Sequence, residues 1–209
     1  MSSVTPPPPP GGGNLVPPGT SPIQMDLVSP LEVARWRVIG NPIMAIPLAI
    51  WMYLVGIAAG VVTFIAWFAI LFTGKYPEGM FDFTAGVMRY QWRVLSFYYF
   101  MKEPYPSFTI ETTTADPGGD QATFSIAYPQ HLSRGLIFVK WLLGIPVFIV
   151  LFVYLIGAGL SLLVGFFAVL FTGKWPEGLK TYIIKVVRLA FKANAYHNLM
   201  TDVYPGFSL

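Results

Sequence analysis

The chain has 209 residues, of which 55% are hydrophobic and 11% are charged, and its mean hydropathy is +0.59. Soluble domains carry roughly 25% charged residues, so this composition is typical of an integral membrane protein. The absence of cysteine excludes disulfides, thiolate metal sites, iron–sulfur clusters and cysteine nucleophiles. The net charge of +3 does not indicate nucleic-acid binding, because basic residues that flank apolar spans usually face anionic lipid.

The first 22 residues form a tail that is rich in proline and glycine. This tail contains the runs Pro6–Pro10 and Gly11–Gly13, and it lacks the basic start and apolar core of a signal peptide. Because the tail has no apolar surface to offset its ordering entropy, we expect a disordered segment with polyproline character. Docking of the proline runs onto an aromatic groove is the alternative.

The rest of the chain is one unit written twice, at a constant offset of 99 residues. Phe68–Met80 returns as Phe167–Leu179, and the same offset places Arg35 on Arg134 without any gap. The two copies are therefore expected to share one architecture. We predict a first repeat over residues 23–108, a linker over residues 109–121 and a second repeat over residues 122–209.

Each repeat begins with a short strand-like segment, Ile23–Val28 in the first copy and Ala122–Tyr128 in the second. Between the copies, the sequence Asp-Pro-Gly-Gly-Asp at residues 116–120 is typical of a turn. The segments 108–114 and 121–128 on either side of it alternate between apolar and polar residues. This pattern predicts a β-hairpin between them.

Two apolar runs, Ile43–Phe72 and Trp141–Phe171, contain no Asp, Glu, Lys or Arg. About thirty residues make a helix about 45 Å long, whereas the hydrocarbon core of a bilayer is about 30 Å thick. One tilted crossing is one interpretation of this length. The other is a helical hairpin that bends at the small residues Ala58–Gly60 and Gly157–Gly159.

The positions of the basic residues favour the hairpin. All 13 Lys and Arg residues lie outside the two apolar runs, and two arms per repeat would keep them on one side of the membrane. Positively charged segments are retained in the cytoplasm. We therefore predict two membrane hairpins in a multi-pass plasma-membrane protein, with both termini in the cytoplasm.

A turn motif, Thr-Gly-Lys-aromatic-Pro-Glu-Gly, follows each apolar run. Its glutamate is expected in the first turn of the next helix, where a carboxylate complements the helix dipole, with a role in proton relay as the alternative. The spacing G-x-x-x-x-G-K-[ST] of a phosphate-binding loop is absent. The motif residues are Thr73, Gly74, Pro77, Glu78 and Gly79 in the first copy, and Thr172, Gly173, Pro176, Glu177 and Gly178 in the second.

The segments 81–101 and 181–200, which follow the two turns, carry a basic stripe among aromatic residues. This pattern predicts an amphipathic helix that lies along the bilayer surface, because a crossing helix would bury these charges at high cost. A third span, interrupted by charges, is the alternative. The expected lipid-interface residues are Lys75, Arg89, Arg93, Lys174, Lys185, Arg188 and Lys192.

No constellation of catalytic residues emerges from the sequence. His131 and His197 lack companions at metal-ligand spacing, and the apolar runs hold no charged side chain for a proton relay and no histidine for haem. We therefore predict no catalytic, cofactor-binding or metal-binding residue.

An ordered set of motifs identifies a family resemblance over residues 23–208. Tyr128-Pro129, the run from Lys140 to Pro146, the turn motif of the second copy and Tyr204-Pro205-Gly206-Phe207 resemble domain of unknown function 4389, a bacterial, largely actinobacterial, membrane family. Members of that family often carry His after the proline of the apolar run, where this chain has Leu48 and Val147. The proline-rich start also resembles a proline-rich accessory factor of actinobacterial respiratory supercomplexes, which implies cytochrome bc-type reductase and cytochrome oxidase as partners.

The predicted fold is an α-helical integral membrane protein, built as a tandem repeat of a membrane helical hairpin and an interfacial amphipathic helix, with short cytoplasmic β-segments. The expected function is that of a non-catalytic accessory subunit of a membrane complex, with a respiratory reductase–oxidase supercomplex as host. Anionic lipids and other membrane subunits are the expected partners. The alternatives are a free-standing membrane-shaping or lipid-organising protein and, third, a transporter component.

Overall fold

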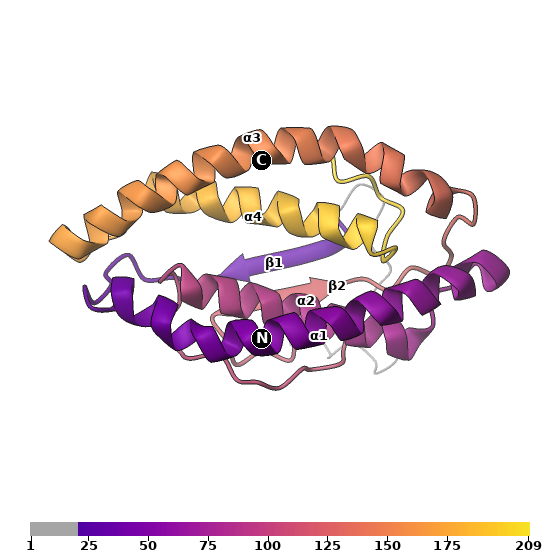
Figure 1. Cartoon of the computed structure of the whole chain (residues 1–209), viewed down its shortest axis with the longest axis horizontal. Helices are drawn as coiled ribbons and strands as arrows, with labels where there is room; N and C mark the ends of the chain where they lie inside the picture. The colour runs from indigo at the N-terminus through magenta and orange to yellow at the C-terminus, as the bar shows by residue number, and fades with distance from the viewer. Residues whose placement is uncertain (1–20) are drawn as a thin grey trace, which may run out of the picture.

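The computed structural model describes residues 21–209 and places four helices and two strands in that part of the chain (Figure 1). The predicted tail, residues 1–22, lies almost wholly outside the described residues. In chain order the elements are β1 (Ile23–Leu27), α1 (Arg37–Thr73), α2 (Glu78–Tyr98), β2 (Ala122–Ile126), α3 (Leu136–Thr172) and α4 (Glu177–His197).

The tandem repeat is confirmed at the level of whole elements. α1 and α3 have 37 residues each, α2 and α4 have 21 each, and the bounds of each pair differ by the offset seen in the sequence. The turn motif has the same conformation in both copies, since Gly74 and Gly173 cap α1 and α3 in the left-handed region at φ of 72° and 73°. Glycine adopts this conformation without steric cost.

The two strands pair with each other across the repeats. β1 and β2 are antiparallel, and Met25 lies opposite Phe124, which is its equivalent in the other copy. A pseudo-two-fold axis therefore passes through this pair and relates the two repeats. The predicted hairpin between residues 108–114 and 121–128 is wrong: residues 108–114 form no strand, and the Thr114 carbonyl accepts one hydrogen bond of 3.0 Å from Ile126.

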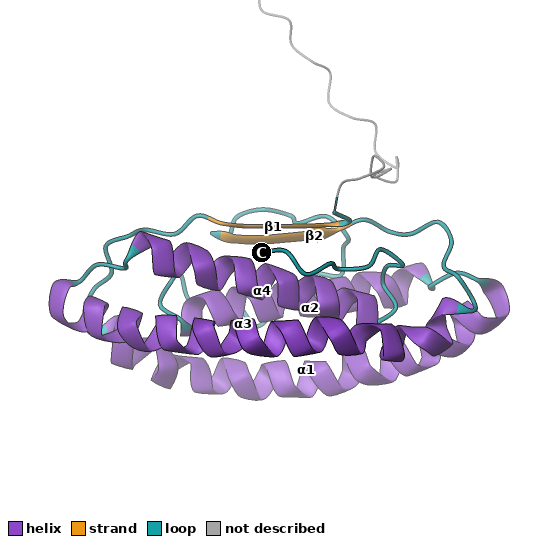
Figure 2. Ribbon diagram, turned by 90° about the horizontal axis from the view of Figure 1, so that it is seen from above, coloured by secondary structure: helices purple, strands orange, loops and turns teal. Residues whose placement is uncertain are grey.

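The elements form layers (Figure 2). The sheet covers one side of α2 and α4, and α1 and α3 lie on the other side and bow away from the sheet. Beneath the sheet, the rings of Trp92 on α2 and Phe191 on α4 meet at a centroid distance of 6.0 Å, and Phe124 of β2 packs on Phe191 at 5.9 Å. The core at this point is shared by the two repeats.

The predicted membrane hairpins are wrong, because α1 and α3 are each continuous through the small residues at their midpoints. Small residues do not interrupt the hydrogen bonds of a helix, and a break there would leave backbone groups unpaired in apolar surroundings. In the second copy the small side chain serves packing instead. A Cβ on Gly157 would lie 2.5 Å from the Tyr182 hydroxyl, which donates a hydrogen bond of 3.1 Å to the Tyr154 carbonyl.

Backbone hydrogen bonds also join the two repeats at both ends of the long helices. The segment before α1 reaches the turn after α3, where Val33 N–H donates to the Gly173 carbonyl at 2.9 Å. The equivalent bond runs from Leu132 N–H to the Gly74 carbonyl, also at 2.9 Å. The start of each long helix is thereby fixed beside the end of the other, so α1 and α3 are antiparallel (Figure 1).

Candidate functional site

The first functional surface is the apolar face of α1 and α3. Each helix buries one stripe against α2 or α4 and exposes apolar side chains elsewhere; Phe64 and Phe152, for example, are each 66% exposed. Both helices are long and apolar enough to cross a membrane. In the most apolar 18-residue stretch of each helix, only 17% (α1) and 22% (α3) is buried. The core helix of a soluble protein would be mostly buried.

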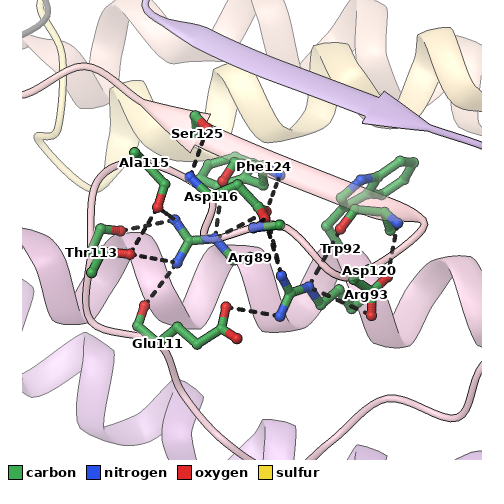
Figure 3. Close-up of polar contacts among 12 residues, drawn as sticks. Arg89, Trp92, Arg93, Glu111, Thr113, Ala115, Asp116, Asp120, Phe124 and Ser125 are labelled. Carbon is green, nitrogen blue, oxygen red and sulfur yellow. Dashed lines mark hydrogen bonds and ion pairs between the residues drawn. The ribbon is translucent and has the colours of Figure 1, made fainter. Parts of the chain in front are cut away.

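The second surface is the polar side of α2 and α4, where the sheet and the linker lie (Figure 2). In the first repeat this side holds a buried cluster of charges (Figure 3). Arg89 is 1% exposed, and its guanidinium donates to the carbonyls of Glu111, Thr113 and Ala115 at 2.8–3.0 Å. Its Nε donates to the Phe124 carbonyl at 3.0 Å.

Arg93, one turn further along α2, forms ion pairs with the carboxylates of the linker. Its guanidinium lies 2.9 Å from Glu111, 3.3 Å from Asp116 and 3.8 Å from Asp120, and the Lys102 ammonium is also paired with Asp120. Burial lowers the pKa of Lys102, and the bond to Asp120 opposes that shift. Three cations therefore meet three carboxylates in this cluster, which satisfies the rule that buried charges are paired.

The prediction that Arg89 and Arg93 face lipid headgroups is wrong, because the linker covers both side chains. The linker approaches α2 closely at Gly86, where a Cβ would lie 2.5 Å from the Glu111 carbonyl oxygen. A glycine is required at this point for the backbone of the linker to reach the two arginines. The linker is thus a lid on the first repeat.

The equivalent positions in the second repeat are open. Arg188 and Lys192 correspond to Arg89 and Arg93, and Arg188 has one carboxylate nearby, that of Asp26 at 3.5 Å. The Nε of Arg188 is buried and has no hydrogen-bond partner among residues 21–209. The position of Gly86 is taken by Lys185, which is exposed and adds a third cation.

An open groove with a volume of about 530 Å³ lies beside this basic set. It runs along β1 and reaches across to the outward-facing hydroxyls of β2. The residues that line it are Ser21, Ile23, Gln24, Met25, Asp26, Thr123, Ser125, Arg188 and Lys192.

Two further cations, which the sequence pattern does not mark as a pair, bind the segments that follow α2 and α4. Arg37 donates to the carbonyls of Lys102 and Glu103, and Lys140 donates to the Thr201 carbonyl at 2.8 Å and lies 2.7 Å from Asp202. Arg37 and Lys140 bind equivalent segments, residues 102–103 and 201–202. Lys140 lies about one helical turn beyond position 136, which is the equivalent of Arg37. A comparison of equivalent positions therefore misses them; their signal is an ionisable residue close to the apolar run.

The remaining residues of the turn motif lie at the ends of the long helices. Glu78 and Glu177 are confirmed in the first turns of α2 and α4. Lys75 and Lys174 are exposed, and Lys174 lies 3.5 Å from Glu32. Their contact with lipid, like that of Lys185, stays a prediction.

His197, for which the sequence predicts no metal-binding role, packs between two rings. Its imidazole lies 4.3 Å from the ring centroid of Trp141 and 5.0 Å from that of Phe148. Burial lowers the pKa of His197, which favours the neutral ring in this apolar setting.

The family model described as "Domain of unknown function (DUF4389)" matches residues 36–109 and 134–208, one match for each repeat. The matched ranges begin just before the long helices and end in the segments that follow α2 and α4. No curated protein and no solved structure matches the chain.

Proposed function

The chain belongs to the family of domain of unknown function DUF4389, and from its geometry we propose that it is a membrane-embedded, non-catalytic accessory subunit of a larger membrane protein complex. The observation that carries this proposal is the division of the described chain into two opposite faces (Figure 2). Two long apolar helices form one face, and a sheet with a charged linker forms the other. A large exposed apolar surface of this kind marks contact with lipid or with other membrane subunits.

In this proposal α1 and α3 lie along the bilayer. Their charge-free parts are about 45 Å long, so a crossing of a 30 Å core would need a tilt of roughly 50°, beyond the usual range of about 0–40°. A crossing would also bring the sheet, which lies beside the middle of the long helices, to the depth of the hydrocarbon (Figure 2). The Arg89 cluster would go with it, because Arg89 is bonded to Phe124 of β2. Open strand edges and polar loops are not stable there.

The ends of the molecule support the same orientation. Arg35 and Lys174 lie at one end of the antiparallel pair α1 and α3, and Lys75 and Arg134 lie at the other. One crossing per helix would put these two pairs on opposite sides of the membrane. Helices along the bilayer keep all four on the cytoplasmic side, as the distribution of positive charge in membrane proteins favours. Both termini are then cytoplasmic, and no helix has to pass through the membrane.

A specific observation favours a second function, that of a free-standing membrane-shaping protein. α1 and α3 bow away from the sheet, so the apolar face is convex (Figure 2). Two helices about 55 Å long, inserted into one leaflet, would expand that leaflet relative to the other.

Purification in a mild detergent followed by mass spectrometry separates the two functions. An accessory subunit co-purifies with other membrane subunits in fixed ratio, and a solitary homo-oligomer would contradict that role. The respiratory reductase–oxidase supercomplex stays the predicted host; its basis is the proline-rich tail, which lies outside the described residues. Oxidase or reductase subunits in the purified complex would bear that prediction out.

The orientation has its own test, which uses nitroxide labels along one helix. Labels at Ile43, Phe64 and Phe72 should all show depths within one leaflet by collision with oxygen and a nickel chelate, with the middle label deeper only by the bow of the helix. A label at the centre of the bilayer between two labels at headgroup depth would mean that the helix crosses the membrane, and the proposed orientation would be wrong.

A further inference from the structure

We propose that the groove between β1 and α4 is a binding site for an extended acidic segment of a partner protein, and that Arg188 and Lys192 hold its carboxylates and backbone carbonyls. The template for this ligand is in the same molecule. On the first repeat, the linker is an extended acidic segment bound to Arg89 and Arg93, which are the equivalents of Arg188 and Lys192.

The two sites differ in their balance of charge among the described residues. The first site holds three cations and three carboxylates, as described above. The second is lined by two cations, Arg188 and Lys192, against the single carboxylate of Asp26, within residues 21–209, and the exposed Lys185 lies one helical turn before Arg188 outside the lining. The groove lining therefore carries an excess of one positive charge, which an acidic ligand would neutralise.

An unpaired buried atom points to the same place. The Nε of Arg188 is buried without a hydrogen-bond partner among the described residues, whereas the Nε of Arg89 donates to the Phe124 carbonyl and lies 3.3 Å from Asp116. A buried donor without an acceptor lowers the stability of the folded chain. A carbonyl or carboxylate bound in the groove would remove this cost.

The edge of β1 that faces away from β2, and that pairs with no strand among residues 21–209, supplies the other wall of the site. On β2, the Phe124 N–H donates to the Asp116 carboxylate and the Phe124 carbonyl accepts from Arg89, so both groups point away from β1. Met25 and Phe124 therefore form a non-hydrogen-bonded pair of the antiparallel ladder, in which each residue directs its backbone groups away from the other strand. The N–H and carbonyl of Met25 thus point away from β2, on the side of β1 where Met25 lines the groove. An extended segment can pair with such an edge, as in recognition by strand addition.

The ligand has to come from another chain, and from a protein rather than from a lipid. Residues 1–20 contain no Asp or Glu, so they cannot supply carboxylates. β1, which lines the groove, lies on the side of α2 and α4 that is opposite α1 and α3 (Figure 2). Because Lys185 replaces Gly86, the ligand backbone has to pass further from α4 than the linker passes from α2.

The test uses the linker itself as the probe. A labelled peptide with the sequence of residues 109–121 is titrated against the full chain in nanodiscs of neutral phosphatidylcholine, together with a panel of extended peptides that carry three Asp or Glu residues. We expect binding that weakens at least tenfold when Arg188→Gln and Lys192→Gln are combined, and at least tenfold when the peptide carboxylates are changed to amides. Binding should also weaken between 0.05 and 0.5 M salt.

The matched control removes two exposed cations elsewhere, Lys75→Gln with Lys174→Gln, and should leave peptide binding unchanged. Binding that is equal in the two double variants would overturn the proposal, as would the failure of every acidic peptide to bind. Soluble short-chain phosphatidylserine and inorganic phosphate are tested in parallel. If either binds through Arg188 and Lys192 while no peptide does, the site is one for phosphate groups and the assignment to an acidic protein segment is wrong.

Discussion

The two repeats have the same helix bounds and the same turn geometry, yet they differ in what covers the polar side of their second helix. On α2 the linker buries Arg89 and Arg93, and on α4 the equivalent Arg188 and Lys192 line an open groove. One linker joins two copies, so the connectivity can cover only one of the two equivalent sites. A duplicated unit can thus hold, in one copy, an acidic segment of the kind that the equivalent site of the other copy is proposed to bind.

The largest difference is expected when the first cation of each site is removed. Arg89→Met leaves Asp116 and several carbonyls buried without their partner, and should lower the free energy of unfolding by about 3–5 kcal/mol. Arg188→Met, in the open site, should change it by less than about 1 kcal/mol. Denaturant unfolding in detergent micelles measures both. Equal losses for the two variants would contradict the distinction between a filled and an open site.

A second prediction concerns position 180, where the repeats differ in chemistry. Lys180 donates to the carbonyls of Ser29 and Pro30, while its equivalent Phe81 is a buried aromatic residue. Burial lowers the pKa of Lys180 from 10.5 to about 8. The unfolded chain then binds the extra proton between pH 8 and 10.5, so the contribution of Lys180 to stability rises with pH across this window, by on the order of 2 kcal/mol.

Lys180→Met isolates this effect, because the equivalent Phe81 shows that the fold accepts an apolar side chain at the position. The difference in unfolding free energy between the parent chain and the variant should shift in favour of the parent as the pH rises from 8 to 10.5. A difference that stays constant, or that shifts the other way, would show that Lys180 is not held against its charged form.

The smallest effect is expected at position 86 and its equivalent. Gly86→Ala places a Cβ against the Glu111 carbonyl, and the strain of about 1–3 kcal/mol is partly offset by a gain of about 1 kcal/mol in helix propensity. A net loss of about 1 kcal/mol should result, whereas Lys185→Ala should be neutral within about 0.5 kcal/mol. Thermal unfolding of the two variants checks this, and a stabilising Gly86→Ala would mean that the linker does not press on α2.

Several parts of the fold could be predicted from the sequence. The offset between the copies predicts the shared architecture, and the turn motif predicts where α2 and α4 begin, because its glutamate and proline suit the first turn of a helix. The small residues at 58–60 and 157–159 do not predict a bend, because a helix tolerates small residues. In the second copy Gly157 makes room for Tyr182, a contact that the sequence does not show.

The basic stripe was located correctly on its helix, but not its surroundings. A helical pattern shows which face carries Arg89 and Arg93; it does not show whether that face meets lipid headgroups or an acidic segment of the same chain. The missing signal was the charge of the linker, whose Glu111, Asp116 and Asp120 match the cations that it covers. The groove on α4 could not be predicted without the pairing of β1 with β2.

In the proposed orientation α1 and α3 lie along the membrane, with the sheet on the cytoplasmic side. Single cysteines at the two ends of the molecule test this orientation directly. The chain has no cysteine of its own, so Lys75→Cys and Lys174→Cys each introduce one reporter. We predict that both are protected from a membrane-impermeant thiol reagent in intact cells and that both react after the membrane is permeabilised. If one of the two reacts in intact cells while the other is protected, the helices cross the membrane and the account is contradicted.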